Sequence, residues 1–240
     1  MEVSNLSIGV VGLGLMGCSI TTCLLMAGHR VVAVAPLPID VPTAQPRIYE
    51  HLKKSLEEGL VTESPDYFLN NLLISEDYAM LVDCELVIEC TLESLPIKKS
   101  VYEKIEAVVS TEAVITSNTS AIPISILQKE VKHPQRFLGL HWAEPSHTTR
   151  FLEVICGELS DVSKGEWLYE LSHHWGKEPT LVRKDIRGFI TNRIMYAMMR
   201  EAFHLVENGY ATVEDVDRSL RNDLGYWITF AGPFRFMDLT

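Results

Sequence analysis

Apolar runs of strand length alternate with helical periodicity over the first three quarters of the chain. The strand-like runs cover residues 6–14, 30–35, 84–90, 113–118, 137–142, 150–157 and 179–184. Between them, helical patterns cover residues 16–29, 47–60, 96–110 and 164–176, and a proline-rich turn is expected over residues 36–46. Strands that alternate with helices predict an α/β fold, here a Rossmann-type, doubly wound and mostly parallel sheet.

The pattern changes near residue 187. Beyond this point no strand is expected, only a helix over residues 189–209 and a second one over 212–222. Thr212 stands three residues before Asp215, an arrangement that resembles a capping box with the shorter acid. We therefore expect a dinucleotide-binding domain over residues 1–187 and a small all-helical domain for substrate binding and dimerisation over residues 188–240.

Composition excludes several classes of protein. Apolar residues make up 47% of the 240, which is enough for a sizeable core, and the formal net charge of −11 argues against nucleic-acid binding. No run of about 18 apolar residues exists to span a membrane, and the opening residues leave no room for a signal peptide. The cysteines form no CxxC pair, so we expect reduced thiols, no metal site and a cytoplasmic location. They are Cys18, Cys23, Cys84, Cys90 and Cys156.

A glycine motif, Gly12-x-Gly14-x-x-Gly17, follows the first predicted strand and opens a helix. The first glycine permits a tight turn, the second lets the backbone approach a pyrophosphate, and the third lets helix and strand pack closely. The motif alone also fits an ordinary tight turn, but this strand–turn–helix context favours dinucleotide binding. Leu15 and Met16 complete the predicted cofactor loop.

Two further segments carry candidate chemistry. Residues 115–128 leave a buried strand and enter a helix; their Ser and Thr side chains fit helix capping, but they also lie where open α/β sheets bind ligands. His141 stands in an apolar strand, where most histidines are ordinary core residues. Glu153, twelve residues later on another strand, offers a carboxylate that would fix the imidazole tautomer and raise its basicity. Asn192, at the predicted joint, could orient a substrate carbonyl.

These motifs together resemble the L-3-hydroxyacyl-CoA dehydrogenase family, with its lambda-crystallin-like and carnitine dehydrogenase relatives. The resemblance covers almost the whole chain. The segments that carry it are GLGLMG, VIECTLESLPIKK, SNTSAIPI, GLHWAEP, LEV, GKEPTLVRKDIRGFITNR, EAFHLVENG, VEDVD and GPFRFMDL. It implies an oxidoreductase of the EC 1.1.1 type that transfers hydride between NAD(P) and a 3-hydroxyacyl-CoA or a small 3-hydroxy acid, in fatty acid metabolism.

The resemblance also implies residue roles. His141 matches the general base and Glu153 the partner that orients it, while Ser120 and Asn192 match the groups that polarise the substrate oxygen. The expected cofactor contacts are Gly12, Gly14, Leu15, Met16, Gly17, Ala35, Glu93, Lys98 and Asn118.

Four departures from the family pattern stand out. Ala35 replaces the aspartate that contacts the adenosine ribose; because no basic residue follows closely, NAD is preferred, with NADP not excluded. Glu144 replaces an asparagine near His141, which favours a cationic substrate such as a carnitine-like compound. The segment around Trp227 is closer to the lambda-crystallin and carnitine branch. The short helical domain predicts a homodimer through its helices, or a truncated chain.

Two alternatives remain open beside the leading hypothesis. One is a catalytically silent nucleotide-binding or scaffold protein, which Ala35 and Glu144 would fit. The other is a carnitine- or gulonate-type 3-hydroxy acid dehydrogenase that uses no CoA. The 6-phosphogluconate dehydrogenase group ranks last, because the interdomain segment offers Arg193 but no catalytic lysine.

Overall fold

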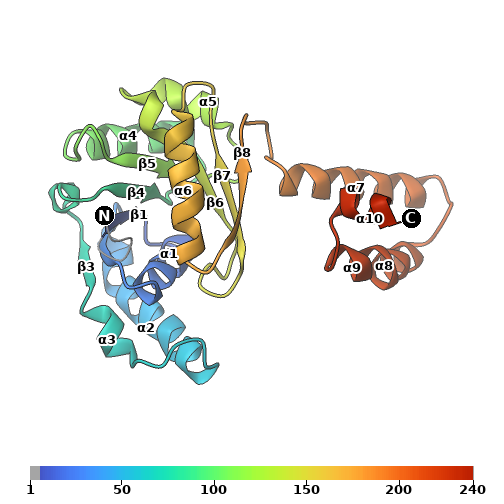
Figure 1. Cartoon of the computed structure of the whole chain (residues 1–240), viewed down its shortest axis with the longest axis horizontal. Helices are drawn as coiled ribbons and strands as arrows, with labels where there is room; N and C mark the ends of the chain where they lie inside the picture. The colour runs from blue at the N-terminus through green and yellow to red at the C-terminus, as the bar shows by residue number, and fades with distance from the viewer. Residues whose placement is uncertain (1–5, 240) are drawn as a thin grey trace. The chain divides into compact units, whose positions relative to one another are not determined.

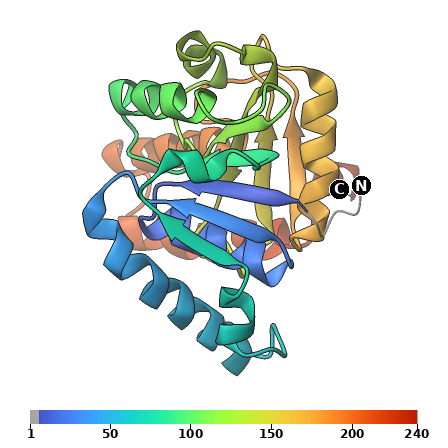
Figure 2. The ribbon, with the colours of Figure 1, turned by 90° about the vertical axis from the view of Figure 1, so that its left-hand side faces the viewer.

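An eight-stranded sheet forms the centre of the N-terminal part of the chain in the computed structural model, which describes residues 6–239. The strand order is β3-β2-β1-β4-β5-β6-β7-β8, and Figure 2 shows the first of these strands side by side, with α2 beyond β3. All neighbouring strands are parallel except β6 and β7. The strands are β1 (Ser7–Val11), β2 (Arg30–Val34), β3 (Leu72–Ser75), β4 (Leu86–Glu89), β5 (Val114–Ser117), β6 (Phe137–Trp142), β7 (Phe151–Ile155) and β8 (Glu178–Val182). The predicted doubly wound sheet is confirmed.

Helices cover both faces of this sheet (Figure 1). They are α1 (Leu15–Met26), α2 (Val41–Glu57), α3 (Pro65–Leu69), α4 (Leu95–Glu106), α5 (Ile124–Leu127) and α6 (Val162–His174), with short 3-10 turns at Pro38–Asp40, Tyr78–Leu81, Gln128–Glu130 and Pro134–Arg136. Side chains alternate along each strand, so each face builds its own core. One core joins the strands to α1, α2 and α6, and the other joins them to α4 and α5.

One prediction about this region was wrong, and one strand was not predicted. Residues 36–46 were expected to form a turn, but α2 already begins at Val41 and contains Pro46. Pro42 occupies the first turn, where its missing N–H costs nothing, and Pro46 removes only one hydrogen bond from a helix whose Ala44, Ile48 and Leu52 are buried. Strand β3 was not anticipated, because its half-exposed LLIS sequence is too short for a clear alternating pattern.

The chain divides into two compact units after Phe189. Within its described residues the second unit contains only helices: α7 (Thr191–Glu207), α8 (Val213–Asn222), α9 (Leu224–Ile228) and α10 (Pro233–Leu239). Thr212 caps α8 as expected, since its hydroxyl accepts a hydrogen bond from the backbone N–H of Asp215 at 3.2 Å. Among the residues described, no helix combines the length and the apolar character that crossing a membrane requires.

Candidate active site

The glycine motif forms the turn between β1 and α1. Gly12 has φ of +100°, a conformation that favours glycine, and a Cβ there would lie 2.8 Å from the carbonyl oxygen of Cys90. A Cβ on Gly17 would overlap the carbonyl oxygen of Gly12. A Cβ on Gly14, in contrast, would meet nothing within 4 Å. Two glycines therefore permit close packing, and the third leaves open space above the turn.

This open space lies where a dinucleotide diphosphate would bind. Gly14 is the N-cap of α1, whose first turn carries no acidic residue, so its N–H groups and the helix dipole favour an anion. The turn also stands beside β4, at the point where the strand order reverses direction, which is the ligand crevice of open α/β sheets. The loop thus fits the diphosphate of NAD, with Leu15 exposed and Met16 partly buried beside it.

The adenosine end of this site lacks its usual acid. Ala35 directly follows β2, is 1% exposed, and donates its backbone N–H to the carbonyl of Ser75 at 2.9 Å. Its methyl group offers no hydrogen bond to a ribose. The next exposed side chains are apolar, with Leu37 at 53% and Ile39 at 73% exposure. An adenosine bound here would therefore depend mainly on apolar contacts and on the diphosphate.

The predicted nicotinamide-side residues belong to one hydrogen-bonded group at the carboxyl ends of β4 and β5. Glu93 accepts hydrogen bonds from the Thr119 hydroxyl and from the backbone N–H groups of Ser120 and Ala121, the last two at 3.2 Å each. Lys98 lies 3.3 Å from the Glu93 carboxylate. Desolvation raises the pKa of Glu93, but the bonds from Thr119 and Lys98 outweigh it, so the pKa is lowered and Glu93 is ionised at neutral pH.

Asn118 connects this group to the neighbouring strand. Its side-chain oxygen accepts a hydrogen bond from the backbone N–H of Trp142 at 3.0 Å. The backbone N–H of Asn118 donates to the backbone carbonyl of Glu89 at 2.8 Å. Asn118 therefore fixes the end of β5 against the ends of β4 and β6.

His141 and Glu153 are direct cross-strand partners. They face each other in the antiparallel register of β6 and β7, and His141 Nδ1 lies 2.9 Å from Glu153 Oε2. Both side chains are buried, at 8% and 1% exposure. Because a carboxylate only accepts, Nδ1–H is the donor, which leaves Nε2 with a free lone pair. The ring centroids of Phe151 and Phe189 each lie 5.5 Å from the centroid of the imidazole. This arrangement suits a general base shielded by aromatic rings.

Ser120 follows β5, and His141 stands near the end of the neighbouring parallel strand β6. Ser117 of β5 pairs with Gly139 of β6, so both candidate residues stand at the carboxyl edge of the sheet, where the glycine loop also lies. Asn192 belongs to the other unit, at the second position of α7. The N-terminal unit by itself thus carries three of the four predicted catalytic residues.

Two residues near this edge, Glu89 and Phe189, were missed by sequence reasoning. Glu89 is fully buried among Lys98, Tyr102 and Ser117. An acid in the apolar run LVIEC, with a lysine nine residues later, was a signal that could have revealed it. Phe189 was also missed: it is fully buried with φ of +48°, an uncommon conformation for a bulky residue, and it covers His141.

Glu144 is exposed and lies three residues after His141. Partial burial raises the pKa of its carboxyl, which hydrogen bonds from Ser19 and from the backbone N–H of Ser146 partly counteract. The following loop is held by Lys177, whose buried ammonium donates to the carbonyl oxygens of Ser146 and Thr149.

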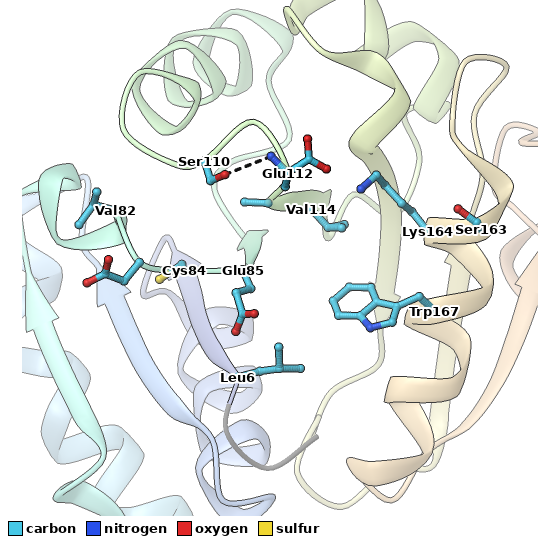
Figure 3. Close-up of a pocket in the computed structure, with 12 residues that line it drawn as sticks. Leu6, Val82, Cys84, Glu85, Ser110, Glu112, Val114, Ser163, Lys164 and Trp167 are labelled. Atoms are coloured by element: carbon cyan, nitrogen blue, oxygen red, sulfur yellow. Dashed lines mark hydrogen bonds between the residues drawn. The ribbon is translucent and has the colours of Figure 1, made fainter. Parts of the chain in front are cut away.

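A separate pocket of about 470 Å³ lies at the opposite edge of the sheet (Figure 3). Leu6, Glu85 and Ala113, which precede β1, β4 and β5, contribute to its walls, and Trp167 of α6 closes one side. Because these are the amino ends of the strands, the pocket is not part of the candidate active site.

Comparison with known proteins agrees with this geometry. Residues 7–186 match the model of the 3-hydroxyacyl-CoA dehydrogenase NAD binding domain, and residues 188–240 match the C-terminal domain of the same family. The chain is 34% identical to 5-formyl-3-hydroxy-2-methylpyridine 4-carboxylate 5-dehydrogenase of Mesorhizobium japonicum, over 97% of this chain and 75% of that protein. It is 32% identical to 3-hydroxybutyryl-CoA dehydrogenase of Mycobacterium tuberculosis, over 97% and 81% respectively.

Solved structures show the same likeness. A crystal structure of 5-formyl-3-hydroxy-2-methylpyridine 4-carboxylic acid 5-dehydrogenase, described as an NAD⁺-dependent dismutase, matches with a TM-score of 0.85 at 32% identity and covers 97% of this chain and 75% of its own. The (S)-3-hydroxybutyryl-CoA dehydrogenase of Ralstonia eutropha matches with a TM-score of 0.85 at 29% identity, over 90% and 76%.

The predicted family, fold, enzyme class and cofactor are confirmed by these matches. With its glycine loop suited to a diphosphate and its matched NAD binding domain, the chain belongs to the 3-hydroxyacyl-CoA dehydrogenase family of NAD-dependent oxidoreductases.

Proposed function

We propose that this enzyme oxidises the hydroxyl group of a 3-hydroxyacyl thioester or a small 3-hydroxy acid, with His141 as general base. The observation that carries the proposal is the His141–Glu153 pair at 2.9 Å, buried beside the edge of the sheet that fits the cofactor. An imidazole whose Nδ1 is held by a buried carboxylate is the arrangement that proton transfer from an alcohol requires.

Each of the four proposed catalytic residues has its own role in the reaction. His141 Nε2 takes the hydroxyl proton, and Glu153 stabilises the imidazolium that results. NAD, when bound, accepts the hydride. Ser120 and Asn192 donate hydrogen bonds to the substrate oxygen as carbonyl character develops. In the direction of reduction, the His141 imidazolium returns the proton to the oxygen.

A His141→Gln variant tests this proposal. We expect kcat to fall by about 10²- to 10⁴-fold, because general base catalysis contributes that much, while NADH affinity changes little. Initial rates of NADH formation and a fluorescence titration of NADH would measure the two quantities. The control is His173→Gln, which changes an exposed histidine of α6. Equal rates for the parent and His141→Gln over a broad substrate panel would instead favour a silent nucleotide-binding protein.

A substrate without CoA is the second candidate. One support is the likeness, over 97% of the chain, to an enzyme whose name specifies a pyridine carboxylate and no CoA. A separate observation, the exposed Glu144 three residues after His141, favours a cationic substrate such as carnitine over an anionic one. Rates with 3-hydroxybutyryl-CoA, 3-hydroxybutyrate, carnitine and gulonate would separate the candidates; a role in fatty acid metabolism follows only for the CoA thioester.

We further propose a homodimer formed through the helical unit, and a cytoplasmic location. The dimer is supported by α7, an amphipathic helix of 17 residues of which none is buried. The location is supported by the five cysteines, all of which are free thiols.

A further inference from the structure

A fully buried carboxylate stands behind the candidate active site. Glu89, the last residue of β4, accepts hydrogen bonds on its two oxygens from Lys98 Nζ at 2.9 Å each, from the Tyr102 hydroxyl at 3.0 Å and from the Ser117 hydroxyl at 2.7 Å. The Thr91 backbone N–H donates a further bond at 2.7 Å. The side chains of Glu89 and Lys98 are 0% and 1% exposed. A charge buried this deeply is stable only when it is paired, and here the pair also holds neighbouring segments.

Lys98 also forms an ion pair with a second carboxylate, that of Glu93. Its ammonium lies 3.3 Å from Glu93, which accepts the hydrogen bonds of Thr119, Ser120 and Ala121. Residues 117–121 are thus held at one end by Glu89, through Ser117, and at the other end by Glu93. Because Lys98 pairs with both carboxylates, a change at Glu89 affects the contacts at both ends of residues 117–121.

We propose that Glu89 is a positioning residue, which acts through Lys98 and Ser117 to fix the segment 117–121 that presents Ser120. The inference rests on the proposed function in giving Ser120 a catalytic role. The Glu89 side chain is fully buried, so it acts through its neighbours and not by contact with substrate or cofactor. Its removal leaves Lys98 with only the half-exposed Glu93 as counter-charge, so the lysine and Glu93 move together and release the backbone N–H groups of Ser120 and Ala121.

Glu106 supplies a matched control. Its side chain is 2% exposed, lies 3.6 Å from Arg136, and accepts hydrogen bonds from the backbone N–H groups of Lys132 and His133 at 2.8 and 3.1 Å. It ends α4 and faces the segment that precedes β6, at the edge of the sheet away from the glycine loop. Glu106→Gln therefore removes a buried ion pair of similar chemistry without touching residues 117–121.

The first measurement is amide hydrogen exchange of the protein without substrate, followed in peptides that cover residues 117–121. Glu89→Gln should speed exchange in this segment, whereas Glu106→Gln should leave it at the parent rate although both variants lower the unfolding temperature. Unchanged exchange in Glu89→Gln overturns the proposal, whatever the activity. This readout does not depend on catalysis, so it is separate from a failure of the proposed function, which would appear as a parent enzyme inactive on every 3-hydroxy substrate.

The second measurement is a double-mutant cycle on kcat. Glu89→Gln should lower kcat by about 10-fold or more, since small displacements of catalytic groups are costly. Because Glu89 acts in part through Lys98 and the Glu93 carboxylate beside it, the double variant Glu89→Gln/Glu93→Gln should lose less than the sum of the two single losses. Fully additive losses, or an equal loss of kcat in Glu106→Gln, would overturn the proposal.

Discussion

Single residues decide which interactions the cofactor site offers. At Ala35 the chain has a buried methyl group where the family pattern has a carboxylate, and exposed apolar side chains, Leu37 and Ile39, follow it. The diphosphate loop is intact, so the loss concerns the ribose and not the dinucleotide as a whole. The affinity for NAD therefore depends more on the glycine loop and α1 here than in a site that keeps the acid.

Restoring the acid should strengthen NADH binding. An Ala35→Asp carboxylate would accept hydrogen bonds from the ribose, and charged hydrogen bonds contribute about 1.5–3 kcal/mol, so we expect the Kd for NADH to fall by about 10-fold or more. NADPH should bind more weakly, because its 2′-phosphate meets the new charge. Fluorescence titrations of both cofactors measure the change, with Ala35→Asn as the neutral control and thermal unfolding to verify the fold. An unchanged ratio of the two Kd values in a folded variant contradicts this account.

At the same scale, the sequence revealed residues whose type is unusual for their position. His141 and Glu153 interrupt apolar strands, and on that ground the sequence predicts that the carboxylate orients the imidazole; the register of β6 and β7 makes the two residues direct cross-strand partners. Glu89 interrupts an apolar strand in the same way, yet its partners come from α4 and β5. Which of several buried polar groups meet is a property of the folded chain, because it depends on register and on helix position.

At the scale of elements, one buried hydrogen bond joins two turns of the N-terminal unit. His29 lies between α1 and β2, and its Nε2 accepts a hydrogen bond from Nε1 of Trp175, directly after α6, at 2.9 Å. His29 is fully buried. Burial, and secondarily the nearby His174, lower the pKa of His29 to about 4. The indole N–H can only donate, so a proton on Nε2 would break this contact between the two turns.

The stability of this contact should depend on pH. The folded-state pKa of His29 lies below its unfolded value of about 6.5, so the unfolded chain binds the extra proton first. The contribution of His29 to the free energy of unfolding is complete above about pH 6.5. It is lost as the pH falls toward 4, by at most about 1.4 kcal/mol per pH unit. Urea unfolding of the parent and of His29→Gln at a series of pH values measures it. If the free energy of unfolding changes with pH equally in both proteins, His29 does not contribute to the pH dependence.

Elements with strong patterns were predictable, and weakly patterned ones were not. The strands that became β1, β2, β4, β5 and β6 are buried on both sides and read as continuous apolar runs. The start of α2 was misjudged because Pro42 and Pro46 indicate a turn when read locally. The burial of Ala44 and Ile48 overrides that local preference, and no local signal records this burial.

At the scale of the whole molecule, the two units differ in how they bury apolar surface. The N-terminal unit has two cores, whereas in the described part of the helical unit only Val216 and Ala231 are buried. Its exposed side chains include Phe203 at 65%, Tyr226 at 70% and Phe234 at 79%. Several large exposed apolar side chains on one small unit are typical of an interaction site, and a second copy of the chain is the partner that the proposed function assigns to it.

A charge on this surface should weaken the dimer. Phe203→Glu places a carboxylate on the apolar face of α7, and each buried Phe contributes about 1.5–3 kcal/mol, so a two-fold interface would lose about 3–6 kcal/mol. We expect the dimer Kd to rise by 100-fold or more. Ala197→Glu, on the polar face of the same helix, is the control. Sedimentation equilibrium measures both, and a parent chain that is monomeric at micromolar concentration contradicts the proposal.

The sequence by itself determined the fold class, the family and the cofactor, because these depend on local signals. Strand and helix periods, the spacing of three glycines and the order of short motifs can all be read along the chain. The sequence also predicts that Glu153 orients His141, and the structure adds the cross-strand register and the 2.9 Å distance of this pair. Only the structure shows the two cores and the network in which Glu89 and Lys98 hold residues 117–121. Contacts between distant segments follow from strand order and register, which only the packing of the whole sheet sets.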